Sequence, residues 1–447
     1  MELPSEFLKI IQEKLGNKTL RFQQALQEPV PVSIRLNPIK PNDVFANFEK
    51  VPWHPQGRYL PERPLFTLDP LFHAGTYYVQ EASSMAIHQA LIQCVDLEKK
   101  INVLDLCAAP GGKSTLLLSA ISPESFLLAN EVIKSRVAPL RQNLIKWGHT
   151  NFMVSNHDPI DFAGLNGFFD VVLIDAPCSG EGLFRKDPNA MKEWSLDQVG
   201  LCSARQKRIL STAHQLVKNG GLLVYSTCTY NDFENDQNVD WLLAQDKFEL
   251  CPLEFPEDWG IEKTRFGYQF FPNRLKGEGF YLSVLKYRNG PSQSNGKQKL
   301  KSEWPFLSKQ ELKAVEPWIE NPARFKFFQK PNFEIVAVPN DLEDNFLKVA
   351  SQLNRRSFGL NIGQLKQKKL IPSHELTLSQ AVNKNLPSIE LDLEAALNFL
   401  RKENFSANTN DTGWHLVKYQ GNNLGWVKLL GNRFNNYLPN EWRIKNL

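Results

Sequence analysis

Short apolar runs alternate with longer amphipathic segments between residues 73 and 288. The amphipathic pattern predicts helices over segments such as Lys134–Trp147 and Asp197–Lys218. Strands that alternate with helices at this spacing are typical of an α/β fold, in which helices cover both faces of a parallel sheet. The expected strands are Val103–Leu106, Phe126–Asn130, Met153–Ser155, Val171–Ile174 and Leu222–Tyr225, followed by a hairpin-like pair near Phe266–Phe271 and Phe280–Leu285.

The pattern changes on both sides of this region, so the chain of 447 residues divides into several parts. Residues 1–72 hold a helical pattern and an extended segment, which predicts a small α+β accessory domain. Residues 73–288 form the α/β domain. Residues 289–303 are rich in turn-forming residues and read as a linker. Residues 304–447 show short strands and many turns, which predicts a separate carboxyl-terminal region.

Composition narrows the class of protein. The chain is 42% hydrophobic and 22% charged, and we find no apolar stretch long enough to span a membrane or to act as a signal peptide. Six cysteines without a C-x-x-C pair argue against a disulfide framework and against a zinc site. We therefore expect reduced thiols, no metal and a cytoplasmic location.

The charge distribution is uneven along the chain. The net charge is +4, and residues 301–447 alone carry 20 Lys+Arg against 15 Asp+Glu. The positive excess therefore lies in the last third, which is compatible with a surface that contacts nucleic acid.

A run of small residues, Cys107–Gly112, separates the first strand of the α/β region from a helix start. Small residues let the backbone approach a ligand closely, and a helix start offers free N–H groups. The run ends like a phosphate-binding P-loop, in Gly112–Lys113–Ser114, but position 107 is Cys where that motif needs Gly. The spacing is also wrong for a dinucleotide fingerprint. The candidate cofactor-binding residues of the loop are Cys107, Ala108, Ala109, Pro110, Gly111, Gly112 and Lys113.

Acidic residues follow successive strands of the predicted sheet. Glu131 comes after the second strand, Asp158 after the third, and Asp175 ends the fourth. Any one of them alone is more often a solvated loop residue or a helix cap. Together, at the carboxyl ends of successive parallel strands, they are typical of a nucleoside-containing cofactor.

Two cysteines also lie just past predicted strands. Cys178 follows Val171–Ile174, and Cys228 follows Leu222–Tyr225. Residues at these positions line the ligand crevice of a parallel sheet, so both thiols are candidates for covalent chemistry. Cys94, Cys202 and Cys251 lie in helical or loop contexts that are typical of inert thiols.

Taken together, Leu104–Lys113, Asp175–Gly180 and Ser226–Thr229 resemble the Sun/Nop-type RNA cytosine-5 methyltransferases. Gly425–Lys428 and Asn436–Pro439 resemble the tail of the bacterial 16S rRNA branch, which carries a PUA-like RNA-binding module. The resemblance implies a Rossmann-like domain with a mostly parallel seven-stranded sheet, a small N-terminal α+β domain and a C-terminal PUA-like region.

The implied cofactor is S-adenosylmethionine, with the loop around its methionine part, Glu131 at the ribose, Asp158 at the adenine region and Asp175 nearby. The implied reaction transfers a methyl group to carbon 5 of cytosine through a cysteine adduct at carbon 6. The resemblance assigns Cys228 as nucleophile, Cys178 to product release and Asp175 to orienting the base. The implied partner is RNA, either 16S rRNA or the 30S subunit, with no membrane partner and with the protein acting as a monomer.

Alternatives stay open at this point. In DNA cytosine-5 methyltransferases the Pro-Cys thiol attacks, which would favour Cys178. A DNA enzyme would share the chemistry, although the Ser226–Thr229 motif and the appended tail argue against it. A non-catalytic RNA-binding protein would have little need of both thiols and all three acids. Candidate RNA contacts, beside the basic tail, are Arg35, Arg185, Lys186, Arg205 and Arg208.

Overall fold

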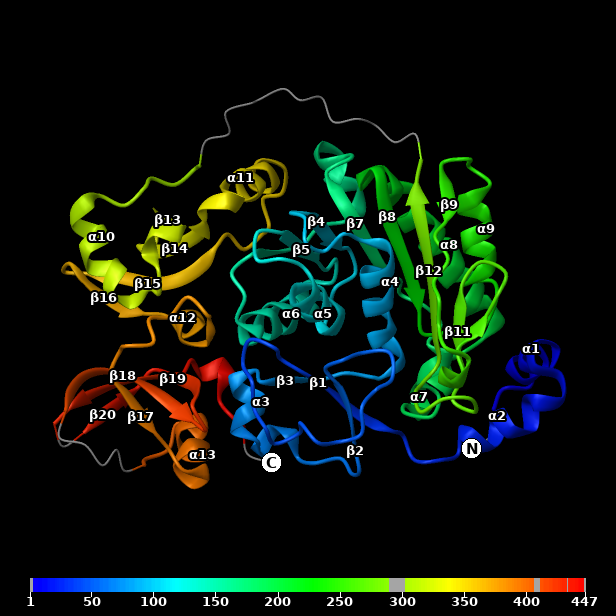
Figure 1. Cartoon of the computed structure of the whole chain (residues 1–447), viewed down its shortest axis with the longest axis horizontal. Helices are drawn as coiled ribbons and strands as arrows, with labels where there is room; N and C mark the ends of the chain where they lie inside the picture. The colour runs from blue at the N-terminus through cyan, green and yellow to red at the C-terminus, as the bar shows by residue number, and fades with distance from the viewer. Residues whose placement is uncertain (1–2, 289–301, 406–410, 432, 446–447) are drawn as a thin grey trace.

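The computed structural model describes residues 3–288, 302–405, 411–431 and 433–445. Four sheets organise these residues: one of three strands, one of nine and two of four. In Figure 1 the nine-stranded sheet extends from the middle to the right of the view, the two four-stranded sheets lie on the left, and the three-stranded sheet lies below. The expected linker at residues 289–303 lies almost entirely outside the described residues.

Within the described residues, the N-terminal part consists of three α-helices and a small antiparallel sheet of order β2-β1-β3. Its third strand, Tyr77–Val79, lies beyond residue 72, where we expected this part to end. The first two helices leave the sheet and pack against the α/β domain through Phe7 and Phe22, which contact Tyr230. The elements are α1 (Ser5–Leu15), α2 (Thr19–Ala25), β1 (Val32–Leu36), β2 (Gly57–Leu60), α3 (Pro70–Ala74) and β3 (Tyr77–Val79).

The central sheet has the order β10-β11-β12-β8-β7-β4-β5-β6, and β9 pairs with β12. The five expected strands are present and parallel, and the expected hairpin forms the antiparallel side as β11 and β12. The Rossmann-like fold is therefore confirmed, but the sheet is mixed and has nine strands where we expected a mostly parallel sheet of seven, because β9 and β10 extend its antiparallel side. The strands are β4 (Asn102–Asp105), β5 (Phe126–Asn130), β6 (Phe152–Ser155), β7 (Phe169–Asp175), β8 (Val217–Thr227), β9 (Phe248–Leu250), β10 (Glu262–Lys263), β11 (Tyr268–Phe270) and β12 (Phe280–Tyr287).

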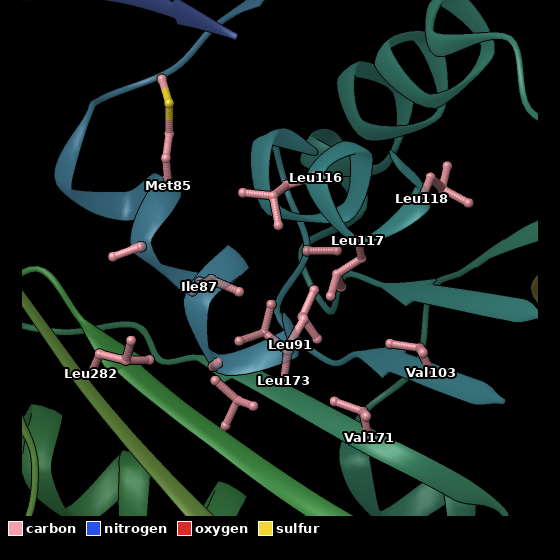
Figure 2. Close-up of a cluster of buried hydrophobic side chains, with 14 of the residues drawn as sticks. Met85, Ile87, Leu91, Val103, Leu116, Leu117, Leu118, Val171, Leu173 and Leu282 are labelled. Atoms are coloured by element: carbon pink, nitrogen blue, oxygen red, sulfur yellow. The ribbon is translucent and has the colours of Figure 1, made fainter. Parts of the chain in front are cut away.

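Alternating residues of the strands contribute side chains to two separate hydrophobic cores, one on each face of the sheet. Val103 and Leu173 belong to one core and Leu104 and Val172 to the other, because successive side chains of a strand point to opposite faces. Figure 2 shows the first core, where Leu91, Leu116 and Leu117 from α4 and α5 cover the strands. The helices of this domain are α4 (Ile87–Cys94), α5 (Gly112–Ala120), α6 (Lys134–Trp147), α7 (Pro188–Glu193), α8 (Leu196–Ala213) and α9 (Asp236–Leu243).

The carboxyl-terminal region forms two four-stranded units, which we call the middle unit (residues 302–385) and the C-terminal unit (residues 386–445). The middle unit packs on the second core of the α/β domain, where Phe346 meets Phe126 with ring centroids 5.3 Å apart. Its elements are α10 (Lys309–Val315), β13 (Phe325–Gln329), β14 (Glu334–Pro339), α11 (Glu343–Gln352), β15 (Leu360–Lys366), β16 (Lys369–Pro372) and α12 (His374–Leu378). The C-terminal unit holds β17 (Ser388–Glu390), α13 (Leu393–Arg401), β18 (Thr412–Tyr419), β19 (Asn422–Leu430) and β20 (Phe434–Asn436).

Within the described residues, every helix is too short or too polar to cross a membrane.

Candidate active site

The glycine-rich loop joins the end of β4 to the start of α5. The Ala108 N–H donates to the Asn130 carbonyl at 2.8 Å, and the Asn143 side chain donates to the Pro110 carbonyl at 2.8 Å. Gly111 lies at a positive φ of 109° immediately before the helix, a conformation that side-chain-bearing residues rarely adopt. A Cβ on Gly112 would come within 3.2 Å of the Tyr78 ring. The loop is therefore anchored at both ends, and its glycines leave the backbone beside the helix start without side chains.

Asp105, at the end of β4, is a site residue that the sequence reasoning did not single out. Its side chain is fully buried, and one carboxylate oxygen accepts a hydrogen bond from the Ser114 hydroxyl at 2.6 Å. The other oxygen, Oδ1, is buried without a partner. Burial raises the pKa of this carboxyl to about 7. A position at the end of the strand before the loop was the one signal that could have pointed to it.

The acids at the ends of β5 and β6 lie in different surroundings. Glu131 is buried, and its carboxylate accepts from the Ile133 N–H at 2.8 Å. Asp158 accepts from the Ile160 N–H at 3.3 Å and pairs with Arg208 of α8 at 3.1 Å. Both residues therefore lie where the sequence placed them, next to successive strand ends, and their contacts with a cofactor stay predictions.

Asp175 and Lys113 form an ion pair between the end of β7 and the loop. Lys113 Nζ lies 2.8 Å from Asp175 Oδ2, and the Ser226 hydroxyl donates to Asp175 Oδ1 at 2.8 Å. Burial opposes the charge on Lys113, but Asp175 and the nearby Cys228 outweigh it and raise the lysine pKa. A fixed positive charge therefore lies close to the Cys228 sulfur.

The two candidate thiols lie in contact. Because β7 and β8 are neighbouring parallel strands with Asp175 opposite Ser226, their ends bring Cys178 and Cys228 together. The sulfur atoms are 3.1 Å apart, and the Cys228 N–H donates to Cys178 Sγ at 3.3 Å. The hydrogen bond with Cys228, together with burial, raises the pKa of Cys178 well above its ordinary value. Cys178 therefore keeps its proton near neutral pH.

A buried polar network, which we call the carboxylate clasp, ties the two cysteine loops together. Glu181 accepts from the Tyr230 and Asn231 N–H groups at 2.8 and 3.0 Å and from Trp194 Nε1 at 3.0 Å. Glu234 accepts from the Ser179 N–H at 3.0 Å. The Asn231 side chain donates to both carboxylates at 2.8 Å. Each carboxylate therefore reaches from one cysteine loop into the other, which fixes the spacing of the thiols.

Replacing Glu181 by Gln is expected to lower the free energy of unfolding by about 2–3 kcal/mol. Glu181 is fully buried, and an amide would turn N–H groups toward at least one of its present donors. Urea unfolding followed by tryptophan fluorescence measures the change. Glu193→Gln, on an exposed position of α7, is the matched control. Equal stability of the two variants would contradict a supporting role for the clasp.

Two of the five residues predicted to contact RNA were wrong, because both are arginines that are buried and make their contacts within the protein. Arg35 is fully buried, donates to Gln80 and Thr115, and lies 4.4 Å from the Trp147 ring centroid. The Arg185 side chain is 4% exposed and pairs with Glu278 at 2.9 Å. Lys186 and Arg205 are exposed, and Arg208 is engaged with Asp158.

The remaining cysteines lie apart from the two thiols at the strand ends. Cys94 and Cys251 contact each other at 3.0 Å, between the end of α4 and the segment after β9. Burial and that contact raise the pKa of Cys94 to about 12. Cys202 is buried in α8. Cys107 lies in the glycine-rich loop, where burial raises the pKa of its thiol.

The Rossmann-like sheet with its glycine-rich loop before α5, together with the family models that match it, defines a methyltransferase domain that binds S-adenosylmethionine. Three family models match the chain. They are described as 16S rRNA methyltransferase RsmB/F (residues 92–286), N-terminal domain of 16S rRNA methyltransferase RsmF (3–82) and methyltransferase RsmF PUA domain (386–444). The chain belongs to the RsmB/F family of 16S rRNA methyltransferases, and it is an S-adenosylmethionine-dependent RNA methyltransferase with a PUA domain.

Relatives cover the chain over its whole length. It is 32% identical to ribosomal RNA small subunit methyltransferase F of Vibrio cholerae, covering 100% of this chain and 99% of the relative. It is 31% identical to the protein of that name from Cronobacter sakazakii, covering 98% and 96%.

Solved structures match the fold. A methyltransferase homologue from Pyrococcus horikoshii is 28% identical, with a TM-score of 0.54 over 63% of this chain and 95% of that one. NSun6 from the same organism, solved with SFG, has a TM-score of 0.53 at 19% identity, over 63% of this chain and 98% of that one, and shows the fold alone.

The residues of the loop fit the cofactor. The cofactor carries an ammonium group, and Asp105 Oδ1 is a buried carboxylate oxygen that lacks a partner. A buried acceptor of this kind costs free energy unless a ligand satisfies it. Asp105 and the loop residues Cys107–Lys113 would hold the methionine part.

Proposed function

We propose that this protein transfers a methyl group to carbon 5 of cytosine in 16S rRNA through a covalent adduct between Cys228 and carbon 6. The observation that carries the proposal is the contact between Cys178 and Cys228 beside the Lys113–Asp175 ion pair. The full-length similarity to ribosomal RNA small subunit methyltransferase F supports 16S rRNA as the substrate.

A thiolate is needed because carbon 5 of cytosine is a weak nucleophile. When Cys228 Sγ bonds to carbon 6, electron density moves to carbon 5, which then takes the methyl group. The bound cofactor supplies that methyl group on a positively charged sulfur. Loss of the carbon 5 proton to a base restores the ring double bond as the carbon 6–sulfur bond breaks.

The surroundings of the thiols favour Cys228 as the attacking group. Cys178 has a strongly raised pKa and stays protonated, so it can donate a hydrogen bond to the other sulfur. Lys113, which Asp175 holds in its charged form, lies near Cys228. Asp175 is held by Lys113 and Ser226, and its oxygens retain lone pairs for the amino edge of cytosine.

The proposal is tested by treating unmodified 16S rRNA with the purified protein and S-adenosylmethionine. Nucleoside mass spectrometry should detect 5-methylcytidine, and sequencing should place it at specific cytosines. A methyl group on another base, or on the ribose, would overturn the cytosine assignment.

Cofactor affinity should increase with pH because of Asp105. Its raised pKa, about 7, leaves the carboxyl mostly protonated at pH 6 and mostly ionised at pH 7.5. Only the ionised form attracts an ammonium group, so affinity should rise roughly eightfold over that range. Calorimetric titration with S-adenosylmethionine measures the effect. Asp105→Asn should abolish the pH dependence, whereas Asp240→Asn, at an exposed site on α9, should keep it.

A further inference from the structure

A cleft lies away from Cys178 and Cys228, where three parts of the chain meet. It has a volume of about 580 Å³ and is lined by residues 39–41 after β1, residues 377–384 around the end of α12, and residues 416–423 of the β18–β19 hairpin. Figure 1 shows α12 and β19 side by side next to the N-terminal sheet. A cavity of this size accommodates one or two nucleotides.

Lysine side chains, and no carboxylates, line the cleft. The lysines are Lys40, Lys384 and Lys418. Within the described chain, Lys384 and Lys418 make no ion pair. Lys40 Nζ donates only to the Ala74 and Lys146 carbonyls, at 2.8 and 2.6 Å. Burial and the nearby Lys146 lower the pKa of Lys40 to about 7. An anion bound in the cleft would stabilise the charged form of Lys40.

Acidic side chains near the rim are already engaged with backbone groups. Glu320 accepts from the Lys384 N–H at 3.3 Å, and Glu390 accepts from the Gly421 N–H at 3.0 Å. Both therefore brace the walls of the cleft, and neither carboxylate is among the groups that line it.

A buried hydroxyl in the cleft wall lacks a partner. Thr377 is fully buried, and its Oγ1 makes no hydrogen bond, although its carbonyl accepts from Asn423 at 3.0 Å. An unsatisfied buried hydroxyl costs about 1–3 kcal/mol. This is an independent sign that the wall is shaped for a polar ligand.

A ligand can approach the backbone closely at the rim of the cleft. Gln420 and Gly421 form the β18–β19 turn, with positive φ angles of 47° and 73°. No atom lies within 4 Å of the position that a Gly421 Cβ would occupy. A polymer can therefore lie directly against this turn.

We propose that this three-lysine cleft binds the sugar–phosphate backbone of the substrate RNA, outside the nucleotide that is methylated. The inference rests on the proposed function. A target cytosine must leave its stack to reach Cys228, so RNA has to be held elsewhere while it does. Lysines supply the phosphate contacts that position RNA, and the amides of Asn422 and Gln380 suit ribose hydroxyls. Two of the three walls come from outside the PUA match, so RNA recognition is shared between units.

The test is the double variant Lys384→Glu/Lys418→Glu. We expect its affinity for 16S rRNA to fall at least tenfold in filter binding, and its salt dependence, as log K against log salt, to flatten by about 1–2. The KM for RNA should rise by a similar factor, while kcat at saturating RNA and the affinity for S-adenosylmethionine stay within twofold. Lys384→Arg/Lys418→Arg should bind like the wild type.

The matched control is Lys309→Glu/Lys313→Glu, which makes the same charge change on exposed positions of α10. If this control weakens RNA binding as much as the cleft variant, the cleft is not the site and the inference is overturned. RNA binding is read without catalysis, so wild-type protein that binds 16S rRNA but does not methylate it would overturn the proposed function alone.

Discussion

A Cys228→Ala variant is expected to lose methylation of 16S rRNA by at least about a thousandfold. Without the sulfur, no covalent bond to carbon 6 can activate carbon 5. Cys178 lies 3.1 Å away, and burial still raises its pKa when the hydrogen bond with Cys228 is lost, so we do not expect it to take over the attack. Transfer of tritium from labelled S-adenosylmethionine to the RNA measures the loss. Cys94→Ala is the control. It removes a thiol that is neither Cys178 nor Cys228, so this variant should keep near-normal activity.

The same variant should also fail to form an adduct with RNA that contains 5-fluorocytosine. With fluorine at carbon 5, no proton is available for removal after methyl transfer, so the wild-type protein should remain attached. The complex is visible as a slower band on a denaturing gel. If Cys228→Ala still formed that complex, the roles of Cys178 and Cys228 would have to be exchanged.

The arrangement of the α/β domain could be predicted because its signals are local. Strands such as Phe126–Asn130 and helices such as Lys134–Trp147 were predicted with the bounds that the structure has. Their apolar runs and amphipathic periods are properties of consecutive residues. Topology then follows, since strands that alternate with helices build a parallel sheet whose carboxyl ends meet. The meeting of Cys178 and Cys228 is a consequence of that rule.

Features that depend on partners far away in the sequence could not be predicted. Arg35 and Arg185 look like solvent-exposed RNA contacts, yet each is buried against groups from other elements, such as Thr115 and Glu278. The carboxylate clasp joins Glu181 to Asn231, 50 residues later. An isolated acid in a loop carries no sign of such a network. Only the folded chain brings its donors together.

The N-terminal part shows the same limit. The apolar face of α1 predicts that the helix is buried but does not identify what covers it. Phe7 packs on Phe184 and Trp194 of the α/β domain, with ring centroids 5.0 and 5.8 Å apart. The helix therefore braces the loop after Cys178, away from the small sheet that follows it in sequence.

A Cys178→Ala variant is expected to accumulate a covalent complex with unmodified 16S rRNA. The thiol of Cys178 can donate a hydrogen bond to Cys228 Sγ, 3.1 Å away, and so stabilise the thiolate that must leave carbon 6. Alanine removes that donor but leaves Cys228 and Lys113 able to form the adduct. Attack and methyl transfer should proceed, while release slows by about 10²–10³-fold.

The complex should appear on denaturing gels in stoichiometric amounts with S-adenosylmethionine present, and digestion with nuclease should leave a modified cytosine on the Cys228 peptide. The double variant Cys178→Ala/Cys228→Ala should give no complex, because the adduct depends on the Cys228 sulfur. A Cys178→Ala variant with normal turnover and no complex would mean that the thiolate leaves unaided. The 3.1 Å contact would then serve only to place the nucleophile.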